Sequence, residues 1–282
     1  MKHIAAINDL SGVGRCSLSV ILPVLSYMGY CVNPVPTAVL SNHTAFPYAY
    51  SVSLTESLKP YLDAWDKNGF QQDAILIGYL GSPEQADVLY QFLTHAREKN
   101  PELIIILDPV MGDHGRLYRN ITSRYIDSMR KLIRLADLCC PNLTEAAFLS
   151  DLDYQGITYA LTQCTSEEGR KMVLNAMFSG LSCLTEGKIV VTGIDCGELY
   201  QNAVWQPDAE LQILYNSKSG AGRPGTGDLF ASIMTGDYLE TGDLVNSVKR
   251  AADFVALSVK HSEEEALAPV FGVQFEDILS RI

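Results

Sequence analysis

The sequence lacks several features that would assign a protein to a common class. Its 282 residues carry a net charge of −12 and contain no cluster of lysine and arginine, which argues against nucleic acid or an anionic membrane as partner. No apolar run approaches the roughly 18 residues of a membrane span, and the N-terminal MKHIAAINDL turns polar too early for a signal peptide. We therefore expect a cytoplasmic protein, in which any bound phosphate is held by local groups.

The cysteines also lack the spacing of a redox or metal motif. There are seven, and no two of them form a C-x-x-C pair. An odd number of scattered cysteines in a chain of this length is typical of reduced, mostly buried thiols. A catalytic or metal-binding cysteine is the less common alternative.

Short apolar runs alternate with amphipathic stretches along the chain. Five of the runs are interpreted as buried strands, at residues 3–7, 74–78, 103–108, 136–140 and 188–192. Two of the helices between them have explicit start signals, a capping serine with a following proline at Ser82 and a capping box that begins at Thr165. This alternation predicts the α/β class, with a mostly parallel central sheet and helices on both faces.

The last third of the chain departs from this alternation. Residues 197–215 are expected to form an antiparallel pair of strands, and helices are expected over 228–240 and 243–260. No repeat, low-complexity tract or proline-rich linker marks a domain boundary. We expect a single domain over residues 1–282.

Ligands of open α/β sheets bind outside the carboxyl ends of the strands. This rule selects polar residues that follow the predicted strands: Asn8 and Asp9 with the following LSGVGR, Gly78 and Tyr79, Asp108 and Pro109, residues 142–145, Thr192 and Gly193, and the glycine-rich stretch 220–230.

The glycine-rich stretch, GAGRPGTGDLF, matches two nucleotide-binding patterns incompletely. Its glycines follow G-x-G-x-x-G, but a dinucleotide fingerprint belongs between the first strand and its helix, and this stretch lies late in the chain. It also resembles a P-loop, but Thr226 stands where a P-loop has the lysine that contacts phosphates.

A glycine-rich turn in front of a helix can still bind an anion. Successive backbone N–H groups of residues 225–227 would point at one spot, supported by the positive end of the helix dipole. Asp228 would then be placed to accept a hydroxyl proton during phosphoryl transfer. The residues alone leave open the alternative that Asp228 caps the helix.

Other strand ends supply groups for a nucleotide and a metal ion. Asp108 ends an apolar strand and Glu145 stands at the mouth of a predicted helix, so the two carboxylates could share Mg²⁺ through its waters. Alternatively, Thr144 and Glu145 are ordinary helix-start residues. Thr192 is expected to contact the nucleotide phosphates, and Arg223 either supplies the missing cation or is solvated.

Five motifs together resemble the ribokinase-like superfamily and, within it, the pyridoxal (vitamin B6) kinases. They are GTGD at 225–228, NLTE at 142–145, DPVMGD at 108–113, SNHTAF at 41–46 and GYLGS at 78–82. The resemblance runs from about residue 3 to residue 260. It implies a ribokinase-like fold, MgATP as phosphoryl donor, a homodimer, and the 5′-hydroxymethyl group of a B6 vitamer as acceptor.

The resemblance also implies roles for individual residues. The catalytic base would be Asp228, and the anion hole would comprise Gly225, Thr226 and Gly227. Substrate-binding residues would be Asp9, Ser41, Asn42, His43, Thr44 and Tyr79, with His43 as a hydrogen-bonding partner of the ring and Tyr79 as its aromatic neighbour. ATP-binding residues would be Asp108, Asn142, Glu145, Thr192 and Arg223, with Asp108 and Glu145 also at the Mg²⁺ ion. Residues 112–122 would form a flap over the phosphates, or a plain surface loop.

Two departures from the pyridoxal kinase pattern concern Asp9 and Asp228. Pyridoxal kinases usually carry serine where Asp9 falls, whereas DLSGVG resembles the hydroxymethylpyrimidine kinases of thiamin synthesis. Many members of that second group replace the base aspartate with cysteine, and this chain keeps Asp228, which favours the B6 branch. A sugar kinase on the same fold and a non-catalytic sensor of nucleotide or vitamer stay open, and so does a requirement for a monovalent cation.

Overall fold

The computed structural model describes all 282 residues and divides into two compact units. Unit 1 comprises Met1–Ile104 and Lys218–Ile282, and unit 2 comprises Ile105–Ser217. Each unit is described by itself below. The expectation of a single domain over residues 1–282 stays a prediction.

Unit 1 contains a mostly parallel sheet in the strand order β4-β1-β2-β3. Its strands are β1 (His3–Ser11), β2 (Cys31–Leu40), β3 (Ser51–Ser53) and β4 (Ala74–Ile77). Strand β1 pairs in parallel with both β2 and β4, whereas β3 adds to β2 in the antiparallel direction. Residues 4–7 of β1 are fully buried, as expected for the central strand of a sheet that is covered on both faces.

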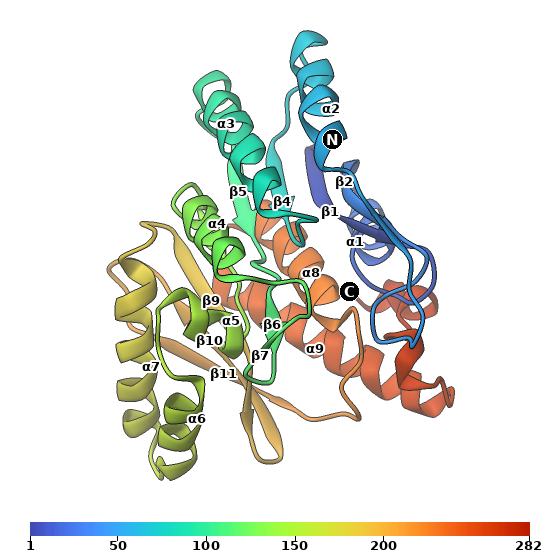
Figure 1. Cartoon of the computed structure of the whole chain (residues 1–282). Coiled ribbons are helices and arrows are strands. Elements are labelled where there is room, and N and C mark those ends of the chain that lie inside the picture. The colour runs from blue at the N-terminus through green and yellow to red at the C-terminus, as the bar shows by residue number, and fades with distance from the viewer. The chain divides into compact units, whose positions relative to one another are not determined.

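Helices flank the sheet of unit 1, and they can be followed in Figure 1. They are α1 (Leu18–Tyr27), α2 (Thr55–Lys67), α3 (Pro83–Lys99), α8 (Thr226–Thr241) and α9 (Leu244–Glu264), followed by the short 3-10 helices η1 (Pro269–Phe271) and η2 (Glu276–Arg281). Helix α8 packs against α1 and α9, while α2 packs against α3 and β2. Almost every residue of α8 from Leu229 to Asp237 is buried, so this helix is held by packing on several sides.

Unit 2 contains the strand order β11-β10-β9-β8-β5. Its elements are β5 (Ile104–Leu107), β6 (Gly112–Asp113), β7 (Arg116–Leu117), α4 (Ser123–Ile133), β8 (Leu138–Cys139), α5 (Leu143–Leu149), α6 (Tyr154–Gln163), α7 (Glu167–Ser182), β9 (Lys188–Cys196), β10 (Leu199–Trp205) and β11 (Gln212–Ser217). The β5-β8-β9 pairs are parallel, and β9-β10-β11 pair in the antiparallel direction. The antiparallel pair predicted from the sequence is therefore confirmed.

The α/β class and all five predicted strands are confirmed, and the differences have local causes. Strand β2 was not predicted, because Asn33, Pro34 and Pro36 interrupt its apolar run. Helix α3 begins at Pro83 as predicted, but the Ser82 hydroxyl makes no capping hydrogen bond. It pairs instead with the Thr55 hydroxyl at 2.9 Å. None of the helices is both long enough and apolar enough to cross a membrane.

Candidate active site

The glycine-rich stretch leads directly into α8 in unit 1. Gly225 is the N-cap residue, with φ 82° in the left-handed region, and the helix starts at Thr226. A Cβ atom at Gly225 would lie 1.9 Å from the Arg15 carbonyl oxygen, so only glycine allows this close approach of two backbones. At Gly227 a Cβ would meet nothing within 4 Å. The first N–H groups of α8 have no partner within the helix, and beside them is space for a ligand.

Asp228 is the third residue of α8, and two donors from distant parts of unit 1 hold its side chain. The Ser17 backbone N–H donates to Oδ2 at 2.8 Å, and the Asn8 side-chain amide donates to Oδ1 at 3.2 Å. Burial raises the pKa of Asp228 to about 6, and the Asp9 carboxylate adds to the rise. The capping alternative does not describe this residue, because the N-cap position belongs to Gly225.

Asp9 at the end of β1 is buried and held by two hydroxyl groups. Ser17 Oγ donates to Oδ1 at 2.5 Å and Ser11 Oγ donates to Oδ2 at 3.0 Å. Burial raises the pKa of Asp9, and these two hydrogen bonds oppose the rise. Ser17 therefore contacts both predicted site carboxylates, one through its hydroxyl group and the other through its backbone.

Asn8 fixes the geometry between Asp228 and the β4 strand end. Its Oδ1 accepts from the backbone N–H groups of Asp9 at 2.9 Å and Tyr79 at 3.0 Å. A Cβ at Gly78 would approach the Asn8 amide nitrogen to 2.3 Å, so the glycine leaves room for this side chain. The Asn8 amide cannot be flipped without losing both bonds, and its Nδ2 must face Asp228.

The sequence reasoning selected the Asn8 segment and the LSGVGR that follows Asp9, but it assigned no role to Asn8 or Ser17. Asn8 had a signal, since it is a polar residue at the end of an apolar strand. Ser17 had none, because its importance comes from its backbone conformation and from contacts with residues far away in the sequence.

Of the other predicted substrate-binding residues, His43 and Tyr79 lie near this carboxylate pair. The His43 ring interacts electrostatically with Asp9. Burial raises the pKa of Tyr79, and the Asp9 charge raises it further. Ser41 and Thr44 are exposed on the loop that carries His43. Ser41 Oγ accepts from the Tyr50 N–H at 3.0 Å, which ties the end of β2 to the chain before β3.

His43 uses both ring nitrogens within the protein. Nδ1 accepts from the Ala45 N–H at 3.2 Å, and Nε2 contacts the Val270 carbonyl oxygen at 2.5 Å. A carbonyl only accepts, so Nε2 carries the proton in this arrangement. A hydrogen bond from His43 to a substrate ring, as the resemblance implies, would require it to release one of these partners.

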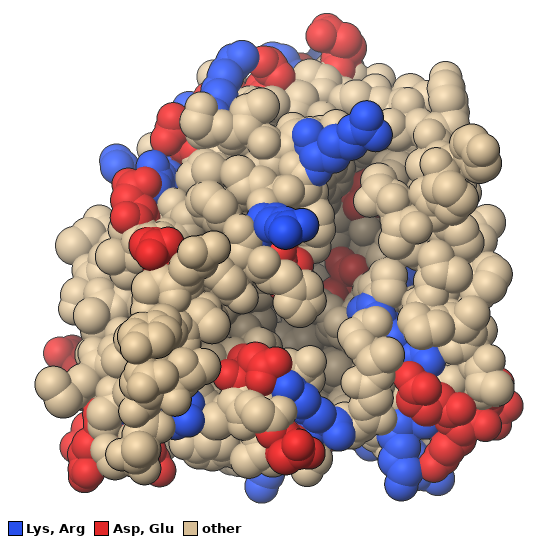
Figure 2. Space-filling model, turned by 60° about the horizontal axis from the view of Figure 1, so that its bottom comes forward, with Lys and Arg blue, Asp and Glu red and all other residues tan.

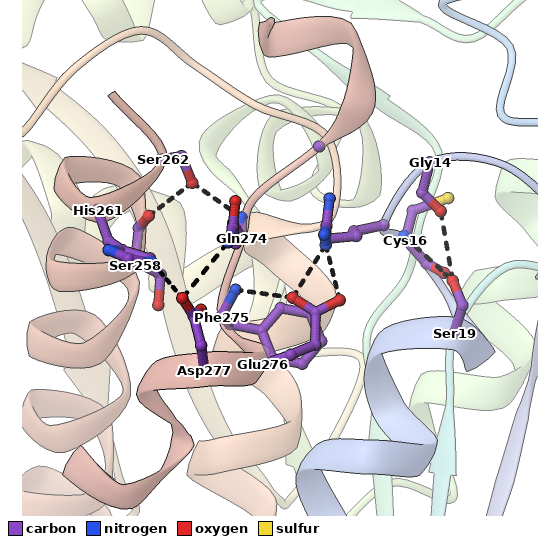
Figure 3. A network of polar contacts seen from close by, with 12 residues as sticks. Gly14, Cys16, Ser19, Ser258, His261, Ser262, Gln274, Phe275, Glu276 and Asp277 are labelled. Atoms are coloured by element: carbon purple, nitrogen blue, oxygen red, sulfur yellow. Dashed lines mark hydrogen bonds and ion pairs between the residues drawn. The ribbon is translucent and has the colours of Figure 1, made fainter. Parts of the chain in front are cut away.

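The C-terminal segment joins the loops that carry these residues. Arg15 donates to Glu276 at 2.7 Å, and its backbone N–H donates to the Phe271 carbonyl at 3.2 Å. Figure 3 shows Glu276 beside Asp277, which is turned toward His261 of α9 and contacts it at 2.8 Å. The segment is thus anchored on α9 and holds the loop that precedes Ser17.

Arg223 belongs to the same assembly. Its side chain is 1% exposed and donates to the Leu267 carbonyl at 2.8 Å and to Glu263 at 2.9 Å. The alternative that Arg223 is solvated is therefore wrong, because the guanidinium is buried. The alternative that it supplies a cation to the nucleotide would require it to leave these partners.

The predicted nucleotide-binding residues of unit 2 gather around the start of α5. Asn142 caps α5 and accepts from the Glu145 N–H at 3.0 Å, while Glu145 Oε2 accepts from the Asn142 N–H at 2.9 Å. Asn142 also forms an isolated β-bridge with Thr192. Asp108 acts electrostatically on Cys139, as Glu145 does. The four predicted residues therefore share one end of the unit 2 sheet.

Glu145 is more than a helix-start residue. Besides the capping box, its Oε1 accepts from the Met111 N–H at 2.9 Å, which ties α5 to the segment after β5. Burial raises the pKa of Glu145 to about 8, and its backbone hydrogen bonds oppose the rise. A divalent cation close to the carboxylate would favour its ionised form.

No group of three or more metal-ligating side chains occurs in the structure. Mg²⁺ commonly binds through one or two carboxylates together with waters and substrate phosphates. The carboxylates of Asp108 and Glu145 satisfy that requirement in their chemistry, since each carboxylate oxygen has a second lone pair to offer.

A family model described as "Phosphomethylpyrimidine kinase" matches residues 26–268. The chain belongs to this family. The match spans most of both units, including the residues around α5 and the GTGD turn of α8.

The chain is also similar to individual relatives, two of which are named as kinases of B6 vitamers. A pyridoxine/pyridoxal/pyridoxamine kinase from Bordetella avium is 32% identical over 255 residues, which cover 86% of this chain and 79% of the relative. A protein from Bacteroides thetaiotaomicron, assigned to the phosphomethylpyrimidine kinases and crystallised with pyridoxal, is 33% identical with a TM-score of 0.87, covering 99% of this chain and 94% of that one. Pyridoxal kinase from Lactobacillus plantarum is 27% identical with a TM-score of 0.87 and coverages of 99% and 96%.

The segment predicted as a flap in this family member forms a small hairpin in unit 2. Strands β6 and β7 pair, and His114 and Gly115 at the turn have positive φ angles of 49° and 74°. The Gly115 N–H donates to the Thr144 hydroxyl at 2.9 Å, so the hairpin is attached to the first turn of α5. Figure 2 shows acidic and basic side chains interspersed over the face that it displays.

Proposed function

We propose that this protein is an ATP-dependent kinase that phosphorylates the 5′-hydroxymethyl group of a B6 vitamer: pyridoxal, pyridoxine or pyridoxamine. The observation that carries the proposal is the Asp228 carboxylate at the N-terminus of α8, with a raised pKa and two donors that fix its position. The names of the Bordetella and Lactobacillus relatives and the pyridoxal in the Bacteroides structure support the choice of acceptor.

In the proposed reaction, the acceptor hydroxyl oxygen attacks the γ-phosphorus of ATP in line with the leaving ADP. Asp228 accepts the hydroxyl proton, which a carboxylate with a pKa of about 6 can do at neutral pH. The N–H groups of residues 225–227 stabilise the negative charge on the transferring phosphoryl group. Ser17 and Asn8 keep the carboxylate oriented while it changes its protonation state.

For the nucleotide we propose Asn142 and Thr192 as phosphate contacts, and Asp108 and Glu145 as the residues that would hold Mg²⁺. When bound, the ion would neutralise phosphate charge. The capping box keeps the Glu145 carboxylate from rotating, since both of its oxygens accept backbone N–H groups. Arg223 could contact the nucleotide only by leaving Leu267 and Glu263, so we assign it to holding the C-terminal segment.

Asp9 is proposed to select the acceptor. An ionised carboxylate that already accepts two hydroxyl groups favours an acceptor with a donor or a positive charge. We therefore expect pyridoxamine and pyridoxine to be accepted alongside pyridoxal. In an Asp9→Ser variant, the range of accepted vitamers should become narrower. Equal activity of that variant on all three vitamers would remove this argument.

A hydroxymethylpyrimidine kinase of thiamin synthesis is the second candidate. The description of the matching family and the aspartate at position 9 favour it. The retained Asp228 and the names of the relatives favour the B6 vitamers. A cytoplasmic location, as expected from the sequence, and a homodimer, as the resemblance implies, complete the proposal.

The deciding experiment measures ADP formation from MgATP with the three vitamers and hydroxymethylpyrimidine in parallel. We expect turnover on the vitamers that falls about a hundredfold or more in Asp228→Asn, the range of a general base. Asp243→Asn is the matched control, because the exposed Asp243 only caps α9 and should leave turnover unchanged. Turnover on hydroxymethylpyrimidine alone would favour the second candidate, and nucleotide binding without any turnover would indicate a sensor.

A further inference from the structure

Ser17 has a backbone conformation that serine rarely adopts. It stands at the N-cap position of α1 with φ 54° and ψ −135°, a region occupied almost only by glycine. A serine in this position ordinarily caps the helix with its side chain. Here the hydroxyl makes no capping bond. The sequence has thus placed a side chain where glycine would be less strained, and the hydroxyl is used for something other than the helix.

Both donors of Ser17 are directed at carboxylates. The backbone N–H donates to Asp228 at 2.8 Å, and the hydroxyl donates to Asp9 at 2.5 Å. The residue is buried, so solvent does not compete with either hydrogen bond. Ser17 thus combines unusual φ and ψ angles with two donors that serve two different side chains.

The chain around Ser17 is clamped from both sides. The Arg15 carbonyl lies against Gly225, and the Arg15 backbone lies against Gly272, where a Cβ atom would come within 2.8 Å of it. On the following turn, the Ser19 hydroxyl donates to the Cys16 carbonyl at 2.6 Å (Figure 3). The two close approaches of Arg15, to Gly225 and to Gly272, hold Ser17 in its strained conformation without touching either carboxylate. The Ser19 hydroxyl takes no part in them.

We propose that Ser17 is the positioning residue of the phosphoryl-transfer site, which fixes the base Asp228 and the acceptor-binding Asp9 relative to each other through one residue. The proposal rests on the kinase function proposed above. It explains why serine is found where glycine would be less strained, since glycine would keep the N–H for Asp228 and lose the hydroxyl for Asp9. It also gives Asp9 a fixed orientation before the acceptor binds, which is a condition for selecting among vitamers.

The first test needs no substrate. The Asp9 carboxyl is titrated by ¹³C NMR in wild type, Ser17→Ala and Ser19→Ala. The Ser17 hydrogen bond lowers the pKa of Asp9, so its removal should shift the titration to higher pH, and Ser19→Ala should leave it unchanged. The charged and titratable groups that face Asp9 are Asp228, His43, Tyr79 and Cys16, and all of them are retained in both variants. An unchanged Asp9 titration in Ser17→Ala would overturn the proposal.

The second test separates positioning from a structural role. In Ser17→Ala and Ser17→Gly, kcat/KM for the vitamer should fall about tenfold to a hundredfold, the size expected for loss of a hydrogen bond to a charged group. KM for MgATP should not change. The Tm of Ser17→Gly should exceed that of Ser17→Ala, because both variants lose the hydroxyl but only glycine relaxes the backbone. Ser19→Ala should keep wild-type kinetics.

A purely structural serine would instead lose activity only in proportion to the unfolded fraction of each variant, with an unchanged kcat/KM for the folded protein. Wild-type kinetics in Ser17→Ala would likewise refute the assignment. If wild type itself turns over none of the acceptors, the proposed kinase function fails. The NMR titration then still decides whether Ser17 holds Asp9.

Discussion

Replacing Asp228 by asparagine should make the folded protein more stable at neutral pH while it removes the proposed base. The pKa of Asp228 is raised from 3.8 to about 6, chiefly by burial. Each unit is worth about 1.4 kcal/mol, so the ionised carboxylate destabilises the fold by at most about 3 kcal/mol above pH 6. The side chain is only partly buried, and solvent screening reduces this figure.

The asparagine side chain loses part of this gain in stability, because it cannot accept both hydrogen bonds of the carboxylate. Ser17 and Asn8 each donate to a different oxygen of Asp228, and asparagine has only one oxygen to offer. Asn8 cannot turn, because its own oxygen accepts from two backbone N–H groups, so one donor of the pair is left facing an NH₂ group. This mismatch costs about 1–2 kcal/mol. The net expectation at pH 7 is a gain of at most about 1–2 kcal/mol, or a Tm higher by up to about 6 °C.

The pH dependence gives the sign of the effect. Below about pH 4 the carboxyl is protonated in both the folded and the unfolded chain, and the penalty is absent. As pH rises from 4 to 6 the unfolded chain releases the proton while the folded chain retains it, so wild type loses stability relative to the variant.

Thermal unfolding of both proteins between pH 5 and pH 8 measures this difference, which should grow with pH and level off above about pH 6 to 7. A variant that is no more stable than wild type at pH 7, with a difference independent of pH, would show that Asp228 is not held with a raised pKa.

Three further results are expected. The kcat/KM for the acceptor should fall about tenfold per pH unit below about pH 6, because Asp228 must be ionised to accept the proton. A kcat/KM that begins to fall only near pH 4 would contradict the raised pKa of Asp228. Gly227→Ala should stabilise α8 by about 0.5–1 kcal/mol yet lower kcat at least about tenfold, because its methyl group enters the space for the anion. The control Gly222→Ala, where the added Cβ also meets open space, should change stability and kcat little. Arg223→Lys should lower the Tm, because lysine cannot replace both donors of the buried guanidinium, and it should leave KM for ATP unchanged; a raised KM at unchanged Tm would instead place Arg223 at the nucleotide.

Much of the fold could be predicted because its signals are local. Strands β4 and β5 are uninterrupted apolar runs, and β1 contains one at residues 4–7. Helix α7 follows the N-cap Ser166, whose hydroxyl accepts from the Gly169 N–H, one residue after the Thr165 where the capping box was predicted to begin. Strand β2 escaped prediction because its prolines are tolerated only through its particular pairing with β1 and β3.

The candidate site could be predicted only in part. Residues at strand ends and at the α8 turn stand out as polar groups or glycines in an apolar context, so the sequence pointed to Asp9, Asp228 and Glu145. The roles of His43 and Arg223 depend on the C-terminal segment, whose carbonyl groups accept their donors. No local pattern connects these residues with a segment more than 40 positions away.

The sequence by itself determined the α/β class, the position of the glycine-rich turn and the chemical types of the groups at the strand ends. Only the tertiary structure decided which donors face the carboxylates. Ser17 and Asp228 are 211 positions apart, and their hydrogen bond depends on a serine backbone held at φ 54°. Apolar periodicity is a property of neighbouring residues, whereas such a backbone conformation is imposed by contacts that form only when the whole of unit 1 has folded.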